Sequence, residues 1–416
     1  MRCPETVVLP MKQHIGAPCV PCVKAGNAVA IGDVVGKSGA YVSAPIHASV
    51  SGTVTKIIPV KLADGSVCDA VVIQSDGQMR VSKSVRPPRV TNKAELVAAV
   101  RESGLVGLGG AGFPTSVKLD VPEGCTVDTL LVNCAECEPY ITSDHRAAVE
   151  DTEDILRGLE TVMRCESIPR AIMAIERNKP DAIRALDDAI RKSSEPESRR
   201  VGMLKLKAKY PQGDEKVLIK ACTGRTLPPG RLPCDVGCLV MNISSAAFLG
   251  SFLRTGIPLV KKRVTVDGSA VSSPKNLIVP IGASVRDVIA CCGGYCEPCG
   301  KLMYGGPMMG VALPNDTFPI IKQNNAILAF GREDSVLPRT TACIRCGRCA
   351  AHCPMHLMPA AVEAAVRTKD IASLKKHGVT VCFECGSCAY SCPAHRQLVQ
   401  VMRLGKAMVR ESQSAE

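Results

Sequence analysis

The sequence predicts a multidomain α/β protein of four consecutive modules, and three observations support this fold class. Segments of strand and helix length alternate through the middle of the chain, which is typical of a doubly wound parallel sheet. Short Val- and Ile-rich runs broken by Gly, Pro and Asp come before them and indicate a small all-β module. Two identical cysteine runs come last. We expect the modules to cover 1–87, 88–258, 259–335 and 336–416.

Composition indicates a reducing compartment and limits the classes of partner. The 23 cysteines are odd in number, and the N-terminus has no signal-peptide pattern, so we expect a cytoplasmic protein. No run of about 18 apolar residues occurs, so we expect no transmembrane segment. The net charge of +12 suits an acidic redox partner or an anionic nucleotide. Nucleic-acid binding is not expected, because aromatic residues are only 3% of the chain.

The N-terminal module contains a hairpin-like segment at residues 44–54 (APIHASVSGTV). It resembles the hairpin of lipoyl- and biotinyl-type barrel-sandwich domains. Those domains acylate a lysine at the hairpin tip, whereas His47, Ala48 and Ser49 occupy it here. We therefore predict no carrier role. We interpret His47 as a surface-turn histidine, with a redox role as the alternative.

A glycine-rich segment opens the second module, after a helix predicted to begin at Asn92. Five glycines within residues 104–112 leave backbone N–H groups bare, so a phosphate or a flat ring could approach closely. Gly107, Gly109 and Gly112 fit GxGxxG, but no strand is predicted before them, so the Rossmann fingerprint is not satisfied. The Walker A pattern is also absent. A purely structural glycine turn remains an alternative.

Acidic and amide residues follow two of the predicted strands of this module. We predict buried strands at 129–133, 171–175 and 201–206, with helices between them. The motif NCAECEPY begins at the end of the first strand, and YPQGDEK (210–216) follows the last. Ligands bind at the carboxyl ends of parallel strands, so these loops suit ribose hydroxyls and a flavin ring. Solvated acidic turns are the alternative.

The third module reads as strand, turn, strand and helix over residues 260–300, a ββα unit of β-grasp type. Four thiols cluster in sequence near its end and could form a thiol pair or a third metal site, at Cys291, Cys292, Cys296 and Cys299. The following loop, GGPMMG (305–310), is expected to pack against the α/β module.

The final module carries two C-x2-C-x2-C-x3-C-P runs, 39 positions apart. This spacing holds two [4Fe–4S] clusters in bacterial ferredoxins, where the fourth cysteine of each run ligates the other cluster. Because the fourth cysteine of each run ligates the other cluster, we predict two ligand sets: Cys343, Cys346, Cys349 with Cys392, and Cys382, Cys385, Cys388 with Cys353. Zinc knuckles fit less well, because they use two short cysteine pairs. A single helix is expected over 359–376.

Eight motifs together connect these modules to one family: QHIGAP (13–18), SAPIHASVSGTV (43–54), GLVGLGGAGFPTSVKL (104–119), NCAECEPYITSDHR (133–146), YPQGDEK (210–216), GGPMMG (305–310), CIRCGRCAAHCPMHLMP (343–359) and CFECGSCAYSCPA (382–394). The chain resembles the RnfC family of the Rnf electron-transport complex over nearly its whole length. The resemblance implies, in order, a barrel-sandwich hybrid, a flavin- and NADH-binding α/β domain, a soluble-ligand-binding β-grasp (SLBB) domain and a two-cluster ferredoxin domain.

The second module is similar to the flavin-bearing subunit of respiratory complex I. That similarity implies an FMN site lined by Gly107, Gly109, Gly110, Ala111, Gly112, Lys118, Asn133, Glu136, Gly213, Asp214, Glu215 and Asn242. It also implies that Phe113 and Glu138 contact the nicotinamide nucleotide. Ala135 stands where the complex I protein typically has an aspartate, so the resemblance does not carry over one flavin or ribose contact.

The resemblance implies an NADH-oxidising iron–sulfur flavoprotein, in which electrons pass from NADH through FMN and two [4Fe–4S] clusters to a partner redox protein. The expected partner is either the membrane subunits of an Rnf complex, with the chain peripheral on the cytoplasmic face, or a soluble reductase. The longer opening segment usual in RnfC proteins is missing here, which would suit a soluble relative such as the one associated with proline reductase. A flavin-free cluster relay is a further alternative. No side chain is expected to act as an acid or base.

Overall fold

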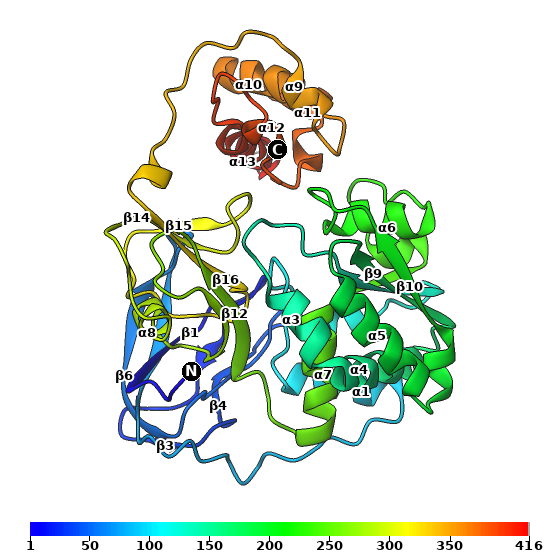
Figure 1. The fold of residues 1–416 in the computed structure, drawn as a ribbon, viewed down its shortest axis with the longest axis vertical. Coiled ribbons are helices and arrows are strands. Elements are labelled where there is room, and N and C mark those ends of the chain that lie inside the picture. The colour runs from blue at the N-terminus through cyan, green and yellow to red at the C-terminus, as the bar shows by residue number, and fades with distance from the viewer. Residues whose placement is uncertain (415–416) are drawn as a thin grey trace.

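The computed structural model describes residues 1–414. In Figure 1 the blue N-terminal strands lie beside the yellow-green strands of residues 261–331, and the cyan-to-green α/β region lies next to both. The orange-to-red C-terminal region is reached through one extended connection. Within the described part of the chain, no helix is both long enough and apolar enough to cross a membrane.

The N-terminal region consists of two small antiparallel sheets, in agreement with the predicted all-β module. The larger has the strand order β1-β7-β6-β3 and the smaller the order β2-β4-β5. At the start of β6, Val54 is buried while Thr53 and Thr55 are exposed, because successive side chains of a strand point to opposite faces. The strands are β1 (Thr6–Pro10), β2 (Val20–Pro21), β3 (Ala28–Val29), β4 (Val34–Lys37), β5 (Ile46–His47), β6 (Gly52–Lys61) and β7 (Val67–Ser75).

The prediction of a surface-turn histidine in this region is wrong. His47 lies in β5 with only 4% of its surface exposed, and burial lowers its pKa to about 3. A Cβ placed on Gly104 would lie 3.2 Å from His47 Nδ1, so the start of the glycine-rich segment covers this side of the barrel. The covering surface belongs to another module, and local sequence therefore carries no sign of the burial.

The α/β region is a four-stranded parallel sheet, as the alternation of strands and helices predicted. The strands are β8 (Thr129–Cys134), β9 (Arg170–Glu176), β10 (Val201–Leu206) and β11 (Cys238–Asn242). The surrounding helices are α1 (Lys93–Glu102), α2 (Thr115–Leu119), α3 (Ser143–Glu150), α4 (Thr152–Cys165), α5 (Pro180–Lys192), α6 (Glu215–Thr223) and α7 (Ile243–Thr255), with short 3₁₀ helices η1 (Pro196–Arg200) and η2 (Pro233–Val236). Asn92 caps α1 as predicted, because its side chain accepts a hydrogen bond from Glu95 N at 3.0 Å.

One strand of this sheet, β11, was not predicted, and it determines where a ligand can bind. The strand order is β10-β9-β8-β11, so the chain winds outward from β8 and then returns to its other side. The order therefore reverses between β8 and β11. In a doubly wound sheet such a switch point opens a crevice at the carboxyl ends of the strands. Asn133 is the second-last residue of β8 and Asn242 is the last residue of β11, and the two are partners in the ladder.

The third region confirms the predicted ββα unit and extends it to a five-stranded mixed sheet with the order β13-β12-β16-β14-β15. Its elements are β12 (Lys261–Asp267), β13 (Lys275–Pro280), α8 (Val285–Ala290), β14 (Cys299–Tyr304), β15 (Val311–Leu313), β16 (Ala326–Gly331) and the 3₁₀ helix η3 (Glu333–Ser335). Ser284 caps α8 by accepting a hydrogen bond from Asp287 N at 3.1 Å.

The C-terminal region is helical, with α9 (Arg348–Ala351), α10 (Pro359–Thr368), α11 (Ile371–Lys376), α12 (Ser387–Tyr390), α13 (Leu398–Ser414) and the 3₁₀ helix η4 (Val379–Val381). The expectation of one helix over 359–376 is wrong. Lys369 adopts a left-handed conformation with φ 54°, and Asp370 caps a new helix through Ser373 N. The short helices α9 and α12 each surround the third cysteine of one run, and they lie against each other.

Candidate functional site

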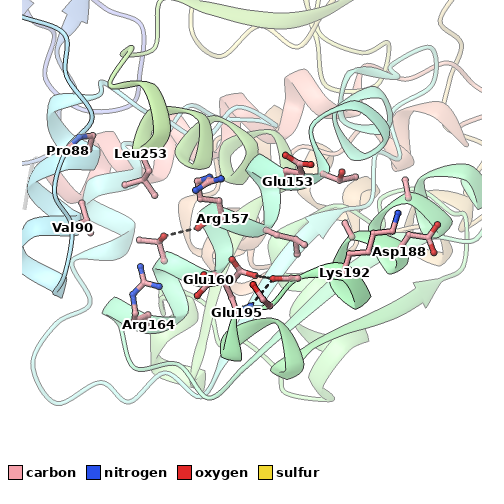
Figure 2. Close-up of a pocket in the computed structure, with 17 residues that line it drawn as sticks. Pro88, Val90, Glu153, Arg157, Glu160, Arg164, Asp188, Lys192, Glu195 and Leu253 are labelled. Carbon is pink, nitrogen blue, oxygen red and sulfur yellow. Dashed lines mark hydrogen bonds between the residues drawn. The ribbon is translucent and has the colours of Figure 1, made fainter.

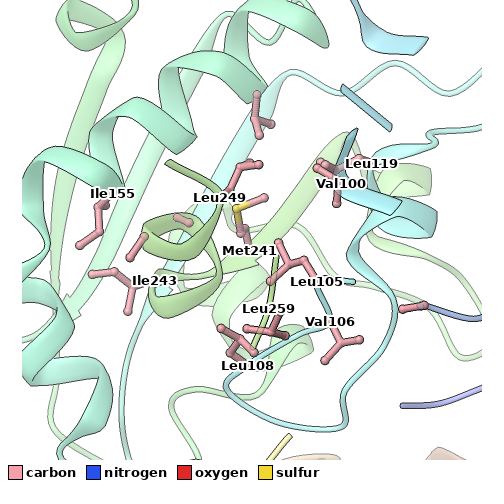
Figure 3. Packing of buried hydrophobic residues seen from close by; sticks show 14 of the residues in the cluster. Val100, Leu105, Val106, Leu108, Leu119, Ile155, Met241, Ile243, Leu249 and Leu259 are labelled. Carbon is pink, nitrogen blue, oxygen red and sulfur yellow. The ribbon is translucent and has the colours of Figure 1, made fainter. Parts of the chain in front are cut away.

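The glycine loop, residues 107–113, is closed at its base by backbone pairing. Gly107 N donates to Phe113 O at 2.9 Å, and Val106 pairs with Pro114. Apolar residues beside the glycines anchor the loop: Figure 3 shows Leu105 and Leu108 in the buried cluster that also contains Met241, Leu249 and Leu259. The segment therefore alternates between side chains that pack into the core and glycines that leave the backbone bare.

The glycines of this loop serve two different purposes. A Cβ on Gly109 would lie 2.3 Å from Asn242 Nδ2, and one on Gly112 would lie 2.7 Å from Gln323 Oε1. These two positions need glycine for close packing. A Cβ on Gly110 would meet no protein atom within 4 Å, and one on Gly107 would meet only Phe113 backbone atoms at 3.8 Å. Open space therefore borders the bare backbone there, as a flat ring requires.

The carboxyl ends of β8 and β11 place the predicted asparagines beside this loop. Asn133 Nδ2 donates to Gly213 O at 2.8 Å, which ties the first acidic loop to the YPQGDEK loop. Asn242 Oδ1 accepts from Ser244 N at 3.0 Å and so caps α7. Asp214 caps α6 in the same way, through Lys216 N and Val217 N. Two helix N-termini thus begin at the predicted site, where their partial positive charge favours an anion such as phosphate.

Lys118 and Glu215 form an ion pair within the same group of residues. Lys118 Nζ lies 2.7 Å from Glu215 Oε1 and also donates to Val240 O at 3.2 Å. Both side chains are about one-third exposed. The pair joins α2, which follows the glycine loop, to the start of α6 and to β11. The structure therefore brings together residues that the sequence spreads over more than a hundred positions.

Glu136 stands at the site, but its carboxylate is fully engaged with the protein. It accepts from Asp144 N at 2.7 Å and His145 N at 3.1 Å, and it pairs with Lys179 Nζ at 3.3 Å. Its side chain is 5% exposed. Glu136 therefore fixes the N-terminus of α3 and the wall of the site, which leaves it no free oxygen atom facing the glycine loop.

Asp144 lies within the motif NCAECEPYITSDHR (133–146), but no role was predicted for it. Its carboxylate accepts from Asn242 Nδ2 at 2.6 Å and from the Ser244 hydroxyl at 2.5 Å. Burial, together with the nearby Glu136 carboxylate, raises the pKa of Asp144. Asp144 lines a cavity of about 370 Å³ behind the glycine loop, with Leu108 and Lys262 among its other lining residues. It orients Asn242 against Gly109 and so shapes the back of the site.

A larger cavity, of about 770 Å³, lies away from these residues. Figure 2 shows it between α4, α5 and the linker at Pro88 and Val90, with Arg157, Glu160 and Lys192 in its lining. The Glu160 carboxylate is already hydrogen-bonded within the protein, because it accepts from the hydroxyls of Ser193 and Ser198. None of the predicted site residues lines this cavity.

The barrel and the SLBB-like sheet both hold the glycine-rich segment through Lys322, another residue that sequence patterns did not indicate. Lys322 is completely buried, and its Nζ donates to Pro45 O at 2.6 Å and to Gly104 O at 2.7 Å. Its backbone N donates to Gln13 Oε1 at 3.1 Å. Burial lowers the pKa of Lys322 to about 7. A lysine from the third region thus joins the first and second at the point where the loop begins.

Glu138 and the 305–310 loop form the mouth of the site. Glu138 accepts from Met308 N at 3.0 Å and from Met309 N at 2.8 Å, and burial raises the pKa of its carboxyl group. A Cβ on Gly306 would lie 2.3 Å from Glu138 Oε2. The expected packing of GGPMMG against the α/β domain is confirmed. Phe113 is half-buried at the end of the glycine loop.

The cysteines of the second predicted ligand set surround one small cavity. Its lining includes Cys353, Cys382, Cys385 and Cys388, so Cys353 of the first run joins three cysteines of the second. Backbone N–H groups point at two of these sulfurs: Leu357 N lies 3.3 Å from Cys353 Sγ, and Glu384 N lies 3.3 Å from Cys382 Sγ. Such donors suit thiolates that ligate a cluster.

Backbone pairing between the two runs places the start of the first predicted set near its fourth member. Thr341 N donates to Ala394 O at 3.0 Å, which places the start of the first run beside Cys392. The pKa of Arg396 is raised, mainly by its hydrogen bond to Glu363 and to a smaller extent by the thiols of Cys343 and Cys392. Cys343 and Cys346 are exposed, whereas Cys385 and Cys388 of the other set are buried. The two sets therefore differ in their access to solvent.

The buried set lies against the α/β domain. The Tyr210 hydroxyl, in the YPQGDEK loop, donates to Cys385 O at 2.5 Å. A Cβ on Gly386 would lie 2.9 Å from Met308 O, so the 305–310 loop touches the same turn. One cysteine set, the mouth loop and the acidic loops therefore meet at a single junction.

The four thiols near the end of the third module do not gather into a metal site. Cys292 is buried in the core of that region, and Cys296 Sγ donates to Ser269 O at 3.2 Å. In the described part of the chain, no three of the thiols of Cys291, Cys292, Cys296 and Cys299 lie within 4.8 Å of one another. A metal site at this position is therefore not supported.

Comparison with known families covers most of the chain. Four family models match in order: the RnfC barrel sandwich hybrid domain at 1–78, the Nuo51 FMN-binding domain at 100–250, the SLBB domain at 263–312 and the 4Fe-4S dicluster domain at 342–395. The solved NAD+-reducing [NiFe]-hydrogenase in its H2-reduced state matches with a TM-score of 0.55 at 18% identity, over 75% of this chain and 63% of that one. At this identity the likeness supports the fold alone.

Whole-length relatives are more similar. The C subunit of the Na(+)-translocating ferredoxin:NAD(+) oxidoreductase complex of Acetobacterium woodii is 41% identical over 359 residues, which cover 86% of this chain and 80% of the relative. The C subunit of the ion-translocating oxidoreductase complex of Rhodobacter capsulatus is 38% identical over 418 residues, covering 100% and 80%. With this identity, coverage and domain order, the chain belongs to the RnfC family of ion-translocating oxidoreductase complexes.

Proposed function

We propose that this chain is the NADH-oxidising subunit of an Rnf-type complex, which takes electrons from NADH and delivers them through FMN and two [4Fe–4S] clusters to a redox partner. The observation that carries the proposal is the junction at Tyr210. There, a cysteine set lies against the loops that surround an open glycine backbone. Close approach of the flavin site and a cluster site is what electron transfer between them requires, and this contact supports such an approach.

The residues around the glycine loop fit FMN. The bare backbone at Gly107 and Gly110 suits the flat isoalloxazine ring, and the N-termini of α6 and α7 suit the phosphate. Asn133 and Asn242, at the switch point, already donate one amide N–H each, to Gly213 O and to Asp144, so the second N–H of each amide would bind a ribityl hydroxyl. Bound FMN would supply the exchange between the two-electron chemistry of NADH and the one-electron chemistry of iron–sulfur clusters.

We assign the predicted site residues according to their contacts. Gly107, Gly110 and Ala111 would border the ring, and Gly109 and Gly112 would keep the loop in place through close packing. Further wall residues are Lys118, Gly213, Asp214 and Glu215, which ion pairing and capping hold at the ends of the strands. Glu136 would act as a positioning residue, since its oxygen atoms already bind α3 and Lys179.

Phe113 and Glu138 would receive the nicotinamide nucleotide at the mouth of the site. Phe113 is half-buried and offers an apolar face next to the loop. Glu138 offers a carboxylate suited to ribose hydroxyls, but Met308 N and Met309 N already bind it. The nucleotide would therefore share Glu138 with the 305–310 loop, so that binding of NADH involves the segment that also touches Gly386.

The exposure of the cysteines supports an order for the clusters. The set of Cys382, Cys385, Cys388 and Cys353 lies next to Tyr210 and would receive electrons first. The set of Cys343, Cys346, Cys349 and Cys392 includes exposed thiols and would be the exit to the partner.

The surface around the exit set suits an acidic redox protein. Residues 336–358 contain Arg339, Arg345 and Arg348 but no Asp or Glu. Ile344, between two of the ligands, is 67% exposed. A small apolar centre with a basic rim favours a partner of opposite charge. The relatives matched are subunits of ion-translocating complexes, which favours Rnf membrane subunits over a soluble reductase and would place the chain on the cytoplasmic face, where NADH is available.

Reconstitution of the whole chain tests this function. After anaerobic reconstitution with FMN, iron and sulfide, we expect about eight irons and one flavin per chain, and NADH-dependent reduction of ferricyanide. A chain that binds the irons but no flavin, and that NADH cannot reduce, would leave only the flavin-free relay.

A further inference from the structure

A group of metal-ligand side chains lies at the edge of the α/β sheet opposite the glycine loop. The thiols of Cys125 and Cys234 and a carboxylate oxygen of Asp235 all lie within 4.8 Å of one another. Among the residues that the structure describes, no other three or more Cys, His, Asp or Glu side chains meet this spacing. None of the three has a role in the proposed electron path.

The sheet explains how residues so distant in sequence meet. Cys125 lies in the connection that leads into β8, and the other two lie in η2, which leads into β11. These strands are parallel neighbours, with Cys238 opposite Thr129 at their amino ends. The loops that precede them therefore end at the same edge of the sheet, and the predicted flavin-binding residues lie at the other edge.

Contacts outside the group hold both loops in place. Arg225 donates to Asp128 Oδ1 at 2.9 Å and to Val236 O at 2.8 Å, so one guanidinium binds the connections before both strands. Asp128 N also donates to Gly237 O at 3.0 Å. The two loops that carry the thiols are thus held together without a disulfide between them, and a ligand would find its donors already close together.

Asp235 is oriented in the manner of a metal-binding carboxylate. Its Oδ2 accepts a hydrogen bond from Leu232 N at 2.7 Å, which fixes the plane of the group. Metal-ligating carboxylates are commonly held by such an outer hydrogen bond. Cys234 and Asp235 are adjacent residues of the short helix η2, and Cys125 comes from the facing turn.

We propose that Cys125, Cys234 and Asp235 bind one zinc ion, with a water molecule in the fourth position. Two thiolates and a carboxylate are ligand types that Zn²⁺ accepts, at about 2.3 Å for sulfur and about 2.0–2.2 Å for oxygen. Tetrahedral geometry then separates the ligand atoms by about 3.5–3.8 Å, which the observed limit of 4.8 Å accommodates. The ion would join the amino ends of the two strands that border the switch point.

The test measures metal in the whole chain, purified anaerobically from zinc-supplemented cells and washed with a weak chelator. We expect about one zinc per chain in addition to the cluster iron, and less than a tenth of that in a Cys125→Ser/Cys234→Ser variant, with iron and flavin unchanged. Cys222→Ser, a thiol of the same domain outside the group, is the matched control and should keep its zinc. Asp235→Asn can still accept the Leu232 hydrogen bond and should weaken zinc binding at least tenfold.

X-ray absorption at the zinc edge identifies the ligands directly. The proposal predicts two sulfur and two oxygen neighbours in the wild-type chain. Equal zinc in the wild type and the double variant would mean adventitious metal only and would overturn the proposal. It would also be overturned by a Cys125–Cys234 disulfide found by peptide mapping of the anaerobically purified, alkylated chain.

Discussion

At the scale of single residues, the glycines of the loop have two different structural roles, which composition alone does not show. Gly109 and Gly112 face other side chains closely, whereas Gly110 faces open space. Sequence motifs identified the loop and the asparagine and acidic residues beside it, because each lies in a recognisable local pattern. They could not identify Asp144 or Lys322, whose importance comes from partners that are distant in the chain.

A substitution at Gly110 tests the open backbone. A Cβ there meets no protein atom within 4 Å and the position needs no unusual φ, so we expect Gly110→Leu to fold normally but to occupy the place of the flavin ring. We expect at least a 100-fold loss of FMN affinity, about 2.7 kcal/mol, with the iron content unchanged. Gly39→Leu, also open and unstrained, is the control. Normal flavin binding by Gly110→Leu, measured by fluorescence titration, would show that the ring lies elsewhere.

The pH dependence of stability tests the burial of Lys322. Its pKa is lowered to about 7 in the folded chain, whereas an exposed lysine titrates near 10.4. Between these values the unfolded chain binds a proton that the folded chain has released, so stability rises with pH by at most about 1.4 kcal/mol per unit. Below pH 7 the folded chain carries the full free-energy cost of burying the charged Lys322 amine.

We therefore expect the urea midpoint of the wild type to increase from pH 7.5 to pH 8.5. In Lys322→Met this increase should be smaller, because the titrating group is gone, whereas the exposed Lys56→Met should retain the wild-type slope. Identical slopes in wild type and Lys322→Met would contradict the burial of a titrating amine at the junction.

At the scale of elements, periodicity and spacing predicted β8, β9, β10, the helix at Asn92 and the ββα unit correctly. They missed β11, a five-residue strand enclosed by Gly237 and a helix that starts immediately after it. They also joined α10 and α11, because the left-handed turn at Lys369 has no glycine to mark it. His47 was misplaced because its burial depends on a neighbouring domain.

The contact between Tyr210 and Cys385 tests how the elements are joined for electron transfer. Removal of one hydrogen bond in Tyr210→Phe should cost about 0.5–1.5 kcal/mol of docking free energy. We expect NADH to reduce the flavin at the wild-type rate and the clusters about three- to tenfold more slowly, as resolved by stopped-flow absorbance.

Tyr41→Phe is the matched control, because Tyr41 also donates a hydrogen bond through its hydroxyl, to Asp120 Oδ2 at 2.6 Å, away from the junction. If Tyr210→Phe and Tyr41→Phe reduce their clusters equally fast, the junction does not control this step.

At the scale of the whole molecule, contacts link the mouth of the candidate site to the junction, and the junction to the C-terminal region. The proposed entry for NADH lies between the α/β and SLBB-like regions, and the exposed cysteine set lies on the C-terminal region beyond the junction. The order of domains could be predicted from motifs. The contacts between the domains could not be predicted, because Lys322, Glu138 and Tyr210 each hydrogen-bond to a domain other than their own.

The basic rim of the exit surface should control encounter with an acidic partner. In Arg345→Glu/Arg348→Glu we expect electron transfer to an acidic ferredoxin to fall about tenfold or more at low salt, with the difference shrinking as salt is added. Arg199→Glu, an exposed change on the α/β domain, should behave like wild type. Equal rates at low salt would show that the partner binds elsewhere.

The central claim is that electrons from NADH reach the clusters only through a flavin held at the glycine loop. The most direct test is NADH reduction of the reconstituted chain, with the clusters followed by electron paramagnetic resonance, in the wild type and in Gly110→Leu. We predict reduced-cluster signals in the wild type and none in Gly110→Leu, although dithionite should produce them in both. Cluster reduction by NADH in a Gly110→Leu chain that contains no flavin would contradict the account.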